Sequence, residues 1–120
     1  MPVTSECFDI VCLRCACGFN EKTYSAIKEL VEQSKPDIWN FLSPNSFLIY
    51  YLTNRSSGLA SQLIESAQSL RQTDSLLTDL QIGSSKGNLV IEKGMFGGIK
   101  AIPMGTAVND AMQTAASDNR

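Results

Sequence analysis

Residues 8–17, FDIVCLRCAC, are the first apolar run of the chain and the starting point for its fold. The run is rich in β-branched and small apolar residues, and Gly18 follows it directly. A short apolar run that ends at glycine is typical of a buried strand. We therefore expect residues 8–17 to form a central strand of a sheet.

The four cysteines, Cys7, Cys12, Cys15 and Cys17, all lie in or beside this strand. Successive strand residues point to opposite faces, so Cys12 opposes Cys15 and Cys17, and four thiolates do not converge easily on one tetrahedral metal ion. Their crowding also argues against a disulfide framework. Because free cysteine is among the most buried residue types, we expect apolar core residues and no metal site, with a metal or redox role as the alternative.

Length, charge and hydropathy limit the classes of protein to consider. The chain has 120 residues, and we expect one domain over residues 1–120 with a frayed tail at 116–120. The net charge of −2 gives no electrostatic reason to bind nucleic acid. No apolar run approaches the ~20 residues of a membrane span, and residues 1–9 lack the pattern of a secretory signal. We expect a cytoplasmic protein without a membrane partner.

A helix and a hairpin follow the first strand. Asn20 suits a helix cap, Tyr24, Ile27 and Val31 recur at helical spacing, and Pro36 ends the helix. Residues 37–52, DIWNFLSPNSFLIYYL, then hold two apolar runs around the turn sequence SPNS. This pattern predicts two paired strands.

The second half of the chain repeats the alternation of helix and strand. Apolar spacing predicts a second helix from Ser56 to about residue 71, and the polar sequence SSKGN predicts a break between short strands at 78–83 and 88–92. A glycine-rich turn, a strand at 99–104 and a helix from Thr106 complete the chain. The order favours an α+β fold, with a ferredoxin-like antiparallel sheet covered by helices on one face.

Four motifs resemble, in order and spacing, the catalytic domain of class III adenylate and guanylate cyclases. IPMGTAVNDA at 102–111 is similar to a strand end followed by G-D-A-V-N-x-A-A-R, and LQIGSSKGNLV at 80–90 is similar to R-I-G-I-H-T-G-x-V. PNSFLIYY at 44–51 lies where the family has G-D-G-F-L-A-V-F, and CACGF at 15–19 lies where it has D-I-x-G-F. The resemblance implies a nucleotide-cyclase-like fold.

The same resemblance implies that the catalytic residues are missing. These cyclases hold two divalent metals with aspartates, which would fall at Cys15 and Asn45, and neither supplies a charged oxygen. The arginine of the terminal helix falls at Gln113, a neutral residue. Only Asn109, which steadies the ribose in the family, is kept.

The residues that read the base are also replaced. The family's lysine falls near Phe41 and its aspartate at Thr106. The resemblance therefore implies a domain without cyclase activity, metal or cofactor. We expect a regulatory or scaffolding module that pairs with a second copy or with another protein.

Two sets of residues are candidates for binding. Met95 and Phe96 in the glycine-rich loop, with Ile99 and Ile102, are typical of interface anchors, although the first two can also fold back onto the core. Alternatively, the domain senses a nucleotide or small ligand without turnover.

In this second interpretation, Asn109 and the backbone amides of Thr106 and Ala107 present a helix N-terminus to an anion. A local hydrogen bond of Asn109 is the competing interpretation. A cysteine enzyme using Cys15 or Cys17 beside Arg14 is a third hypothesis, but the chain has no histidine to act as its base.

Overall fold

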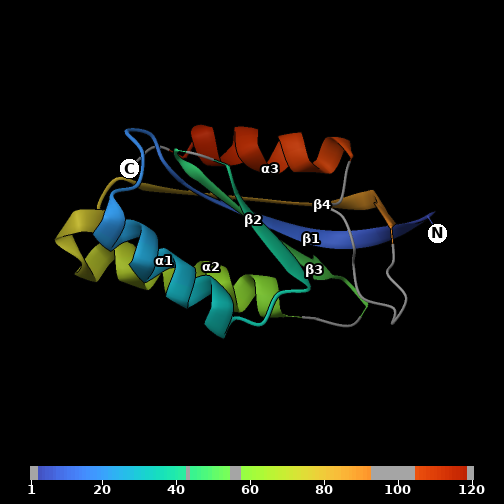
Figure 1. The fold of residues 1–120 in the computed structure, drawn as a ribbon, viewed down its shortest axis with the longest axis horizontal. Helices are drawn as coiled ribbons and strands as arrows, with labels where there is room; N and C mark the ends of the chain where they lie inside the picture. Colours follow the sequence, from blue (N-terminus) through green and yellow to red (C-terminus); the bar gives the residue numbers. More distant parts are fainter. Residues whose placement is uncertain (1–2, 43, 55–57, 93–104, 119–120) are drawn as a thin grey trace.

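Four strands and three α-helices form the described part of the chain, in the order β1, α1, β2, β3, α2, β4, α3 (Figure 1). The computed structural model describes residues 3–42, 44–54, 58–92 and 105–118. The strands are β1 (Val3–Cys15), β2 (Ile38–Leu42), β3 (Ser46–Leu52) and β4 (Leu80–Glu92). The helices are α1 (Glu21–Gln33), α2 (Leu59–Thr73) and α3 (Thr106–Ala116), with a short 3-10 helix, η1 (Ser75–Leu77), before β4.

β1 lies inside the sheet, whose strand order is β2-β3-β1-β4. It pairs antiparallel with β3, from Phe8↔Leu52 to Arg14↔Ser46, and with β4 along its whole length. This is the ferredoxin-like order that the alternation of elements predicted. The α+β class, the antiparallel sheet and the central position of the first strand are confirmed.

The prediction of two short strands around SSKGN is wrong, because β4 runs without a break from Leu80 to Glu92. Each of its residues has a partner on β1, from Val3↔Glu92 to Cys15↔Leu80. For the same reason β1 begins at Val3, five residues before the predicted start at 8. Pairing between the two strands outweighs the local turn signals of serine, lysine and glycine.

The beginning of α1 follows from its sequence. The Thr23 N–H donates to Asn20 Oδ1 at 2.9 Å, and the Asn20 N–H donates to Thr23 Oγ1 at 2.9 Å. This reciprocal pair satisfies backbone donors that a helix start leaves free. The helix ends at Gln33, and Lys35 beyond it has a positive φ of 55°. The capping role predicted for Asn20 is confirmed.

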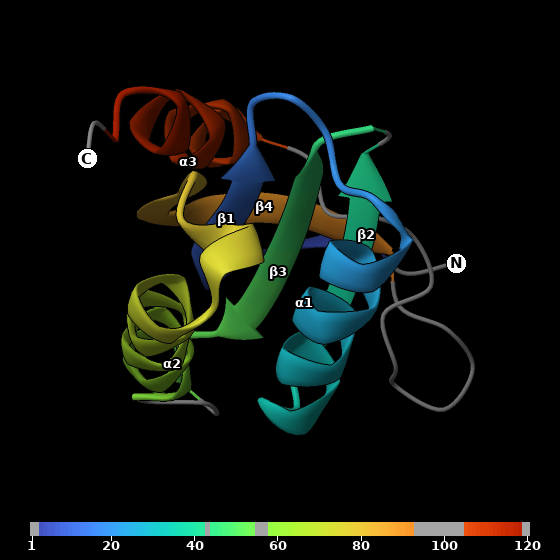
Figure 2. The same ribbon diagram turned by 90° about the vertical axis from the view of Figure 1, so that its left-hand side faces the viewer.

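Helices cover both faces of the sheet (Figure 2). α1 and α2 lie on one face, against the large side chains of β1 and β3, and α3 lies on the other. The α1/α2 face buries Val11, Leu13, Phe47, Ile49, Tyr51 and Leu63, among others, and the α3 face buries Phe8, Ile10, Leu48, Tyr50 and three alanines of α3.

The prediction of helices on one face is therefore right for α1 and α2 and wrong for α3. Both β1 and β3 carry apolar side chains at odd and even positions, so each face of the sheet needs a cover.

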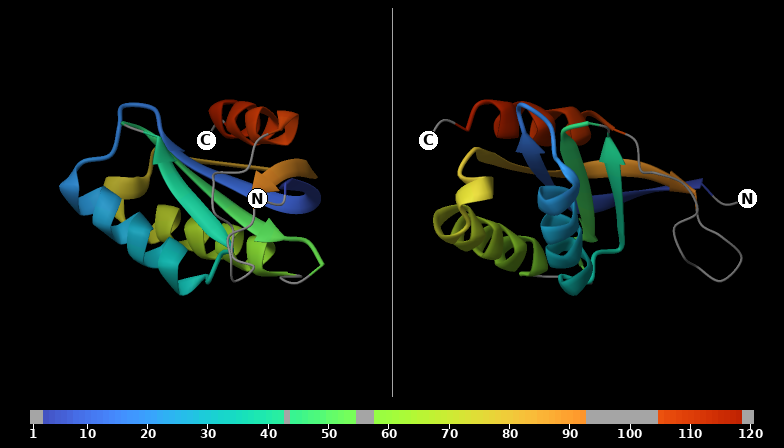
Figure 3. Two further views of the ribbon diagram at one scale, coloured as in Figure 1. Left: turned by 45° about the vertical axis from the view of Figure 1, so that its right-hand side comes forward. Right: turned by 60° about the vertical axis from the view of Figure 1, so that its left-hand side comes forward.

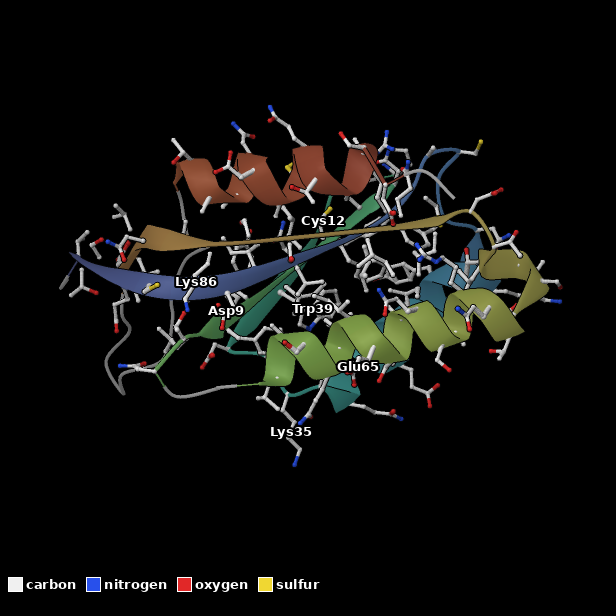
Figure 4. All side chains as sticks on the ribbon, turned by 180° about the vertical axis from the view of Figure 1, so that it is seen from behind. Asp9, Cys12, Lys35, Trp39, Glu65 and Lys86 are labelled. Atoms are coloured by element: carbon white, nitrogen blue, oxygen red, sulfur yellow. The ribbon has the colours of Figure 1, made fainter. Side chains whose placement is uncertain are left out.

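The cysteines divide between these faces. Cys12 is buried on the α3 face and Cys15 on the α1/α2 face, which confirms that they oppose each other. Figure 4 shows Cys12 between the sheet and α3, whereas Trp39 lies on the side of α2. Cys17 is exposed after the end of β1 and Cys7 is half-buried, so the core prediction is wrong for these two.

α3 approaches β4 closely because only small residues lie between them. Ala107, Ala111 and Ala115 form its buried face. A Cβ added to Gly83 would lie 2.1 Å from the Ala115 backbone nitrogen and 2.5 Å from the Ala111 carbonyl oxygen. Glycine at this position of β4 is therefore required by the position of the helix.

The chain after α3 is held to the fold as far as Asp118. Asp118 Oδ2 accepts a hydrogen bond from the Ile82 N–H at 2.9 Å and forms an ion pair of 2.8 Å with Arg71 Nη1. Arg71 Nη1 also donates to the Leu80 carbonyl oxygen at 3.1 Å. The expectation of a frayed tail is therefore wrong for residues 116–118, and residues 119–120 lie outside the described ranges.

No helix in the described residues is long and apolar enough to cross a membrane. The predicted strand at 99–104 lies outside the described residues, as do the candidate interface residues Met95, Phe96, Ile99 and Ile102.

Candidate functional site

Three positions that the cyclase resemblance singled out meet in one surface depression. Asn45, Asn109 and Gln113 line a hollow of about 380 Å³ on the α3 face of the sheet. The residues that line it come from the end of β1, the β2–β3 turn, the start of β3 and α3. They are Arg14, Asn45, Ser46, Asn109, Met112, Gln113 and Ala116.

The sheet register places Arg14 at the centre of this group. Arg14 is paired with Ser46 of β3 on one side and with Gln81 of β4 on the other. Like Cys12, two residues earlier on β1, it lies on the face that α3 covers. Asn109 and Gln113 are four residues apart in α3, so their side chains project from the same side of the helix. The right-hand view of Figure 3 shows α3 above the end of β1.

Arg14 is the charged residue of the depression, and its partner is neutral. The half-buried guanidinium donates a hydrogen bond from Nη1 to Gln81 Oε1. Gln81 Nε2 in turn donates to the Ala116 carbonyl oxygen at 3.4 Å, near the end of α3. Asn45 Oδ1 accepts from the Ser46 hydroxyl at 3.0 Å.

Cys15, the first metal position by resemblance, does not reach the depression. Its side chain is buried on the α1/α2 face. Burial, with smaller contributions from the nearby Asp79 carboxylate and Cys17, raises the pKa of the Cys15 thiol from 9.0 to about 11. The thiol is therefore neutral near pH 7, and a neutral thiol is a poor metal ligand.

Phe41 also lies away from the depression, on the α1/α2 face. Its ring packs against Phe47, with centroids 4.8 Å apart, and perpendicular to Tyr24 at 5.0 Å. The position of the family's base-reading lysine is thus part of an aromatic cluster. This placement explains why an apolar residue is suited to it.

The helix N-terminus predicted as an anion site does not contribute to the depression either. Thr106 is exposed at the start of α3, and the Ala107 side chain is buried against the sheet. The Ala107 carbonyl oxygen accepts a hydrogen bond from Ser85 Oγ at 2.5 Å. Of the three predicted ligand-binding residues, only Asn109 lines the hollow.

From the sequence, Arg14 was noted only as a neighbour of the cysteines, and its place in this site was missed. The signal was its position in the strand. Residues two apart in a strand lie on the same face, so Arg14 shares a face with Cys12, and Cys15 lies on the opposite one.

The chemistry available in this depression is hydrogen bonding around one positive charge. Within the described ranges, no carboxylate or cysteine lines it. All the described residues together contain no cluster of three or more histidine, cysteine or acidic side chains that could bind a metal ion. Amide groups and a guanidinium donate hydrogen bonds to oxygen atoms of a ligand.

Comparison with known proteins gives structural relatives only. No family profile matches the sequence, and no curated protein matches it. The guanylyl cyclase Cya2 has a similar structure, with a TM-score of 0.67 and 13% sequence identity over 99% of this chain and 74% of that one. A bacterial light-regulated adenylyl cyclase matches with a TM-score of 0.60 and 12% identity over 97% of this chain.

A third relative is the catalytic core of a rhodopsin-guanylyl cyclase with converted specificity, solved in complex with ATPαS, with a TM-score of 0.58 and 12% identity. This chain spans 76% of that structure and only 40% of the light-regulated enzyme. The domain therefore has the fold of class III nucleotide cyclase catalytic domains, which confirms the fold that the motifs implied. At these identities the likeness concerns the fold alone.

Proposed function

We propose that this chain is a catalytically inactive nucleotide-cyclase-like domain that acts as a regulatory or scaffolding module and pairs with a second copy of itself. The observation that carries the proposal is the chemistry of the depression. At the positions where the family has an aspartate and an arginine, its lining holds the amides of Asn45 and Gln113.

The loss of these groups has a large expected effect on catalysis. Magnesium and manganese bind through hard, charged oxygen ligands, and an amide oxygen brings no negative charge. Asn45 Oδ1 already accepts a hydrogen bond from Ser46. Removal of one well-placed charge-stabilising donor costs about 2.7 to 4 kcal/mol of transition-state stabilisation. Here the family's arginine is replaced by Gln113, in addition to the two metal-binding aspartates.

Exposed apolar side chains support the proposed self-association. Val90 is 52% exposed and Val3 is 63% exposed. Val3 pairs with Glu92 and Ser5 pairs with Val90, so the two valines are diagonal neighbours on one face at the open end of the β1–β4 pair. Neighbouring exposed apolar side chains of this kind are typical of interaction sites.

Two measurements test this proposal. We expect the purified chain to have the solution mass of two copies and to release no cyclic nucleotide from ATP or GTP with magnesium or manganese. Val90→Lys should shift the mass toward one copy. Leu76→Lys is the matched control, because Leu76 is 55% exposed on η1, away from this end of the sheet.

Cyclic nucleotide that is released by the chain and lost in Asn109→Ala would refute the proposed inactivity. A single-copy mass at all concentrations would refute the self-association.

A further inference from the structure

We propose that the depression around Arg14 binds a small molecule through an oxyanion, a phosphate or carboxylate group, without the help of a metal ion. This inference rests on the part of the proposed function that concerns the depression, namely that no metal-binding carboxylate is found among the described residues of its lining. It assigns the ligand to Arg14, at a place separate from the N-terminus of α3.

Arg14 carries a positive charge beside a neutral partner. Among the described residues, the guanidinium contacts the neutral Gln81 amide and forms no ion pair. Arg71, which is also partly buried, differs because it is paired with Asp118. A half-buried guanidinium has lost part of its shell of water. A bound oxyanion would supply hydrogen bonds and an opposite charge in place of that water.

Several hydrogen-bond donors surround this charge. Arginine has five N–H groups, of which the bond to Gln81 uses one, and its planar fork matches two oxygens of a phosphate or carboxylate. Asn109 and Gln113 add side-chain amides from α3. Asn45 Oδ1 accepts from Ser46, and the Nδ2 group of the same amide is a further donor at this site.

The electrostatics and the size of the hollow also suit a small anion. The C-terminal part of α3 lies beside it, and carbonyl groups at a helix end disfavour an anion. Here the Ala116 carbonyl oxygen accepts a hydrogen bond from Gln81 Nε2, the amide that also contacts Arg14. The bond satisfies that carbonyl. The volume of about 380 Å³ lies at the small end of the range for ligand sites, as expected for a small anion.

Calorimetric titration of the full chain with pyrophosphate in EDTA and low salt tests the inference, and malonate serves as the dicarboxylate probe. We expect at least one of the two to bind, and Arg14→Gln to weaken that binding about tenfold or more. Lys86→Gln is the matched control, since it removes the same charge from an exposed position of β4 beyond the depression and should leave binding unchanged.

Preference for pyrophosphate or for malonate shows which oxyanion the site selects. Absence of binding by both probes overturns the inference, as does equal binding by Arg14→Gln and the unchanged chain.

A second variant keeps the test decisive if Arg14→Gln does not fold. Gln113→Glu places a negative charge on the exposed side of α3 without removing a contact of Arg14, and it should abolish binding. Undiminished binding by this variant overturns the inference. The outcome is separable from the proposed function, because cyclic nucleotide release with magnesium would refute inactivity while leaving the metal-free titration valid.

Discussion

The face of the sheet under α1 and α2 is filled by large aromatic and aliphatic side chains, whereas the face under α3 is closed by alanine and glycine. On the first face, Phe47 contacts the rings of Phe19, Tyr24, Trp39 and Phe41. On the second, alanines of α3 lie almost directly on the backbone of β4.

The two faces of the sheet therefore contribute differently, one to stability and the other to the position of a helix. Burial of large rings removes much apolar area from water and so provides stability. Close contact between alanine and glycine removes less area, but it leaves the helix little freedom to shift. The α3 face therefore fixes the positions of Asn109 and Gln113 over Arg14, and the α1/α2 face supplies most of the buried apolar volume that supports it.

The largest expected effect is on the face with the rings. Phe47→Ala should lower the free energy of unfolding by about 3–5 kcal/mol, because a fully buried ring is replaced by a cavity among four other aromatic side chains. Denaturant unfolding measures this loss. Phe41→Ala, which truncates a half-buried ring of the same cluster, should cost less. Equal losses for the two variants would contradict the central role of Phe47.

A smaller loss of stability but a larger displacement is expected from Gly83→Ala. The new methyl group would meet backbone atoms of Ala111 and Ala115, which cannot rotate away, so α3 must move outward. We expect a loss of about 1–3 kcal/mol and faster amide hydrogen exchange throughout α3. Unchanged exchange in α3 would show that the helix is not fixed by this contact.

Alkaline pH tests whether the two faces bury their ionisable groups equally well. Burial raises the pKa of Cys12 on the α3 face and of Cys15 on the α1/α2 face from 9.0 to about 11, and that of Tyr50 to about 12. The folded chain therefore holds these protons more tightly than the unfolded chain does. Stability should be fully present below pH 9 and fall as the pH rises toward 11.

The measurement is the free energy of unfolding at pH 8 and pH 10 for the unchanged chain, Cys12→Ala and Cys15→Ala. Each substitution should reduce the difference between the two pH values. If Cys12→Ala leaves that difference unchanged, the thiol under α3 is reached by water.

The smallest effect is expected from Gly87→Ala, four residues after Gly83 on the same strand. Its new Cβ would lie 2.8 Å from the Cβ of Ala107, a side chain at the first turn of α3, and meets no backbone atom within 4 Å. We expect a loss below about 1 kcal/mol, since the end of the helix can adjust. Thermal unfolding of the two variants measures the difference between their losses of stability. A loss for Gly87→Ala as large as that for Gly83→Ala would contradict this expectation.

Signals that act over a few residues predicted the fold well. The Asn20 cap, the spacing of the α1 residues and the start of α3 at Thr106 depend on neighbours in sequence, and the structure confirms them. The continuity of β4 and the side on which α3 packs depend on contacts with distant strands. These contacts overrode the turn residues in SSKGN, and periodicity alone carries no information about them.

The candidate site shows the same division. Motif order led to Asn45, Asn109 and Gln113, which the structure brings together. It also led to Cys15 and Phe41, which lie on the other face, because a match to a motif does not report which way a strand residue points. Arg14 was not found, since its importance comes from the strands and the helix that surround it.

The ion pair between Arg71 and Asp118 also protects the molecule from aggregation. β4 is an outer strand of the sheet, and such a strand offers its backbone groups as a template for another chain. At its first residues, the Leu80 carbonyl and the Ile82 N–H are already bound by these two side chains. Removal of the last residues from Ser117 onward would free the Ile82 N–H and leave Arg71 without its anionic partner, so a shortened chain should aggregate more readily than the longer one.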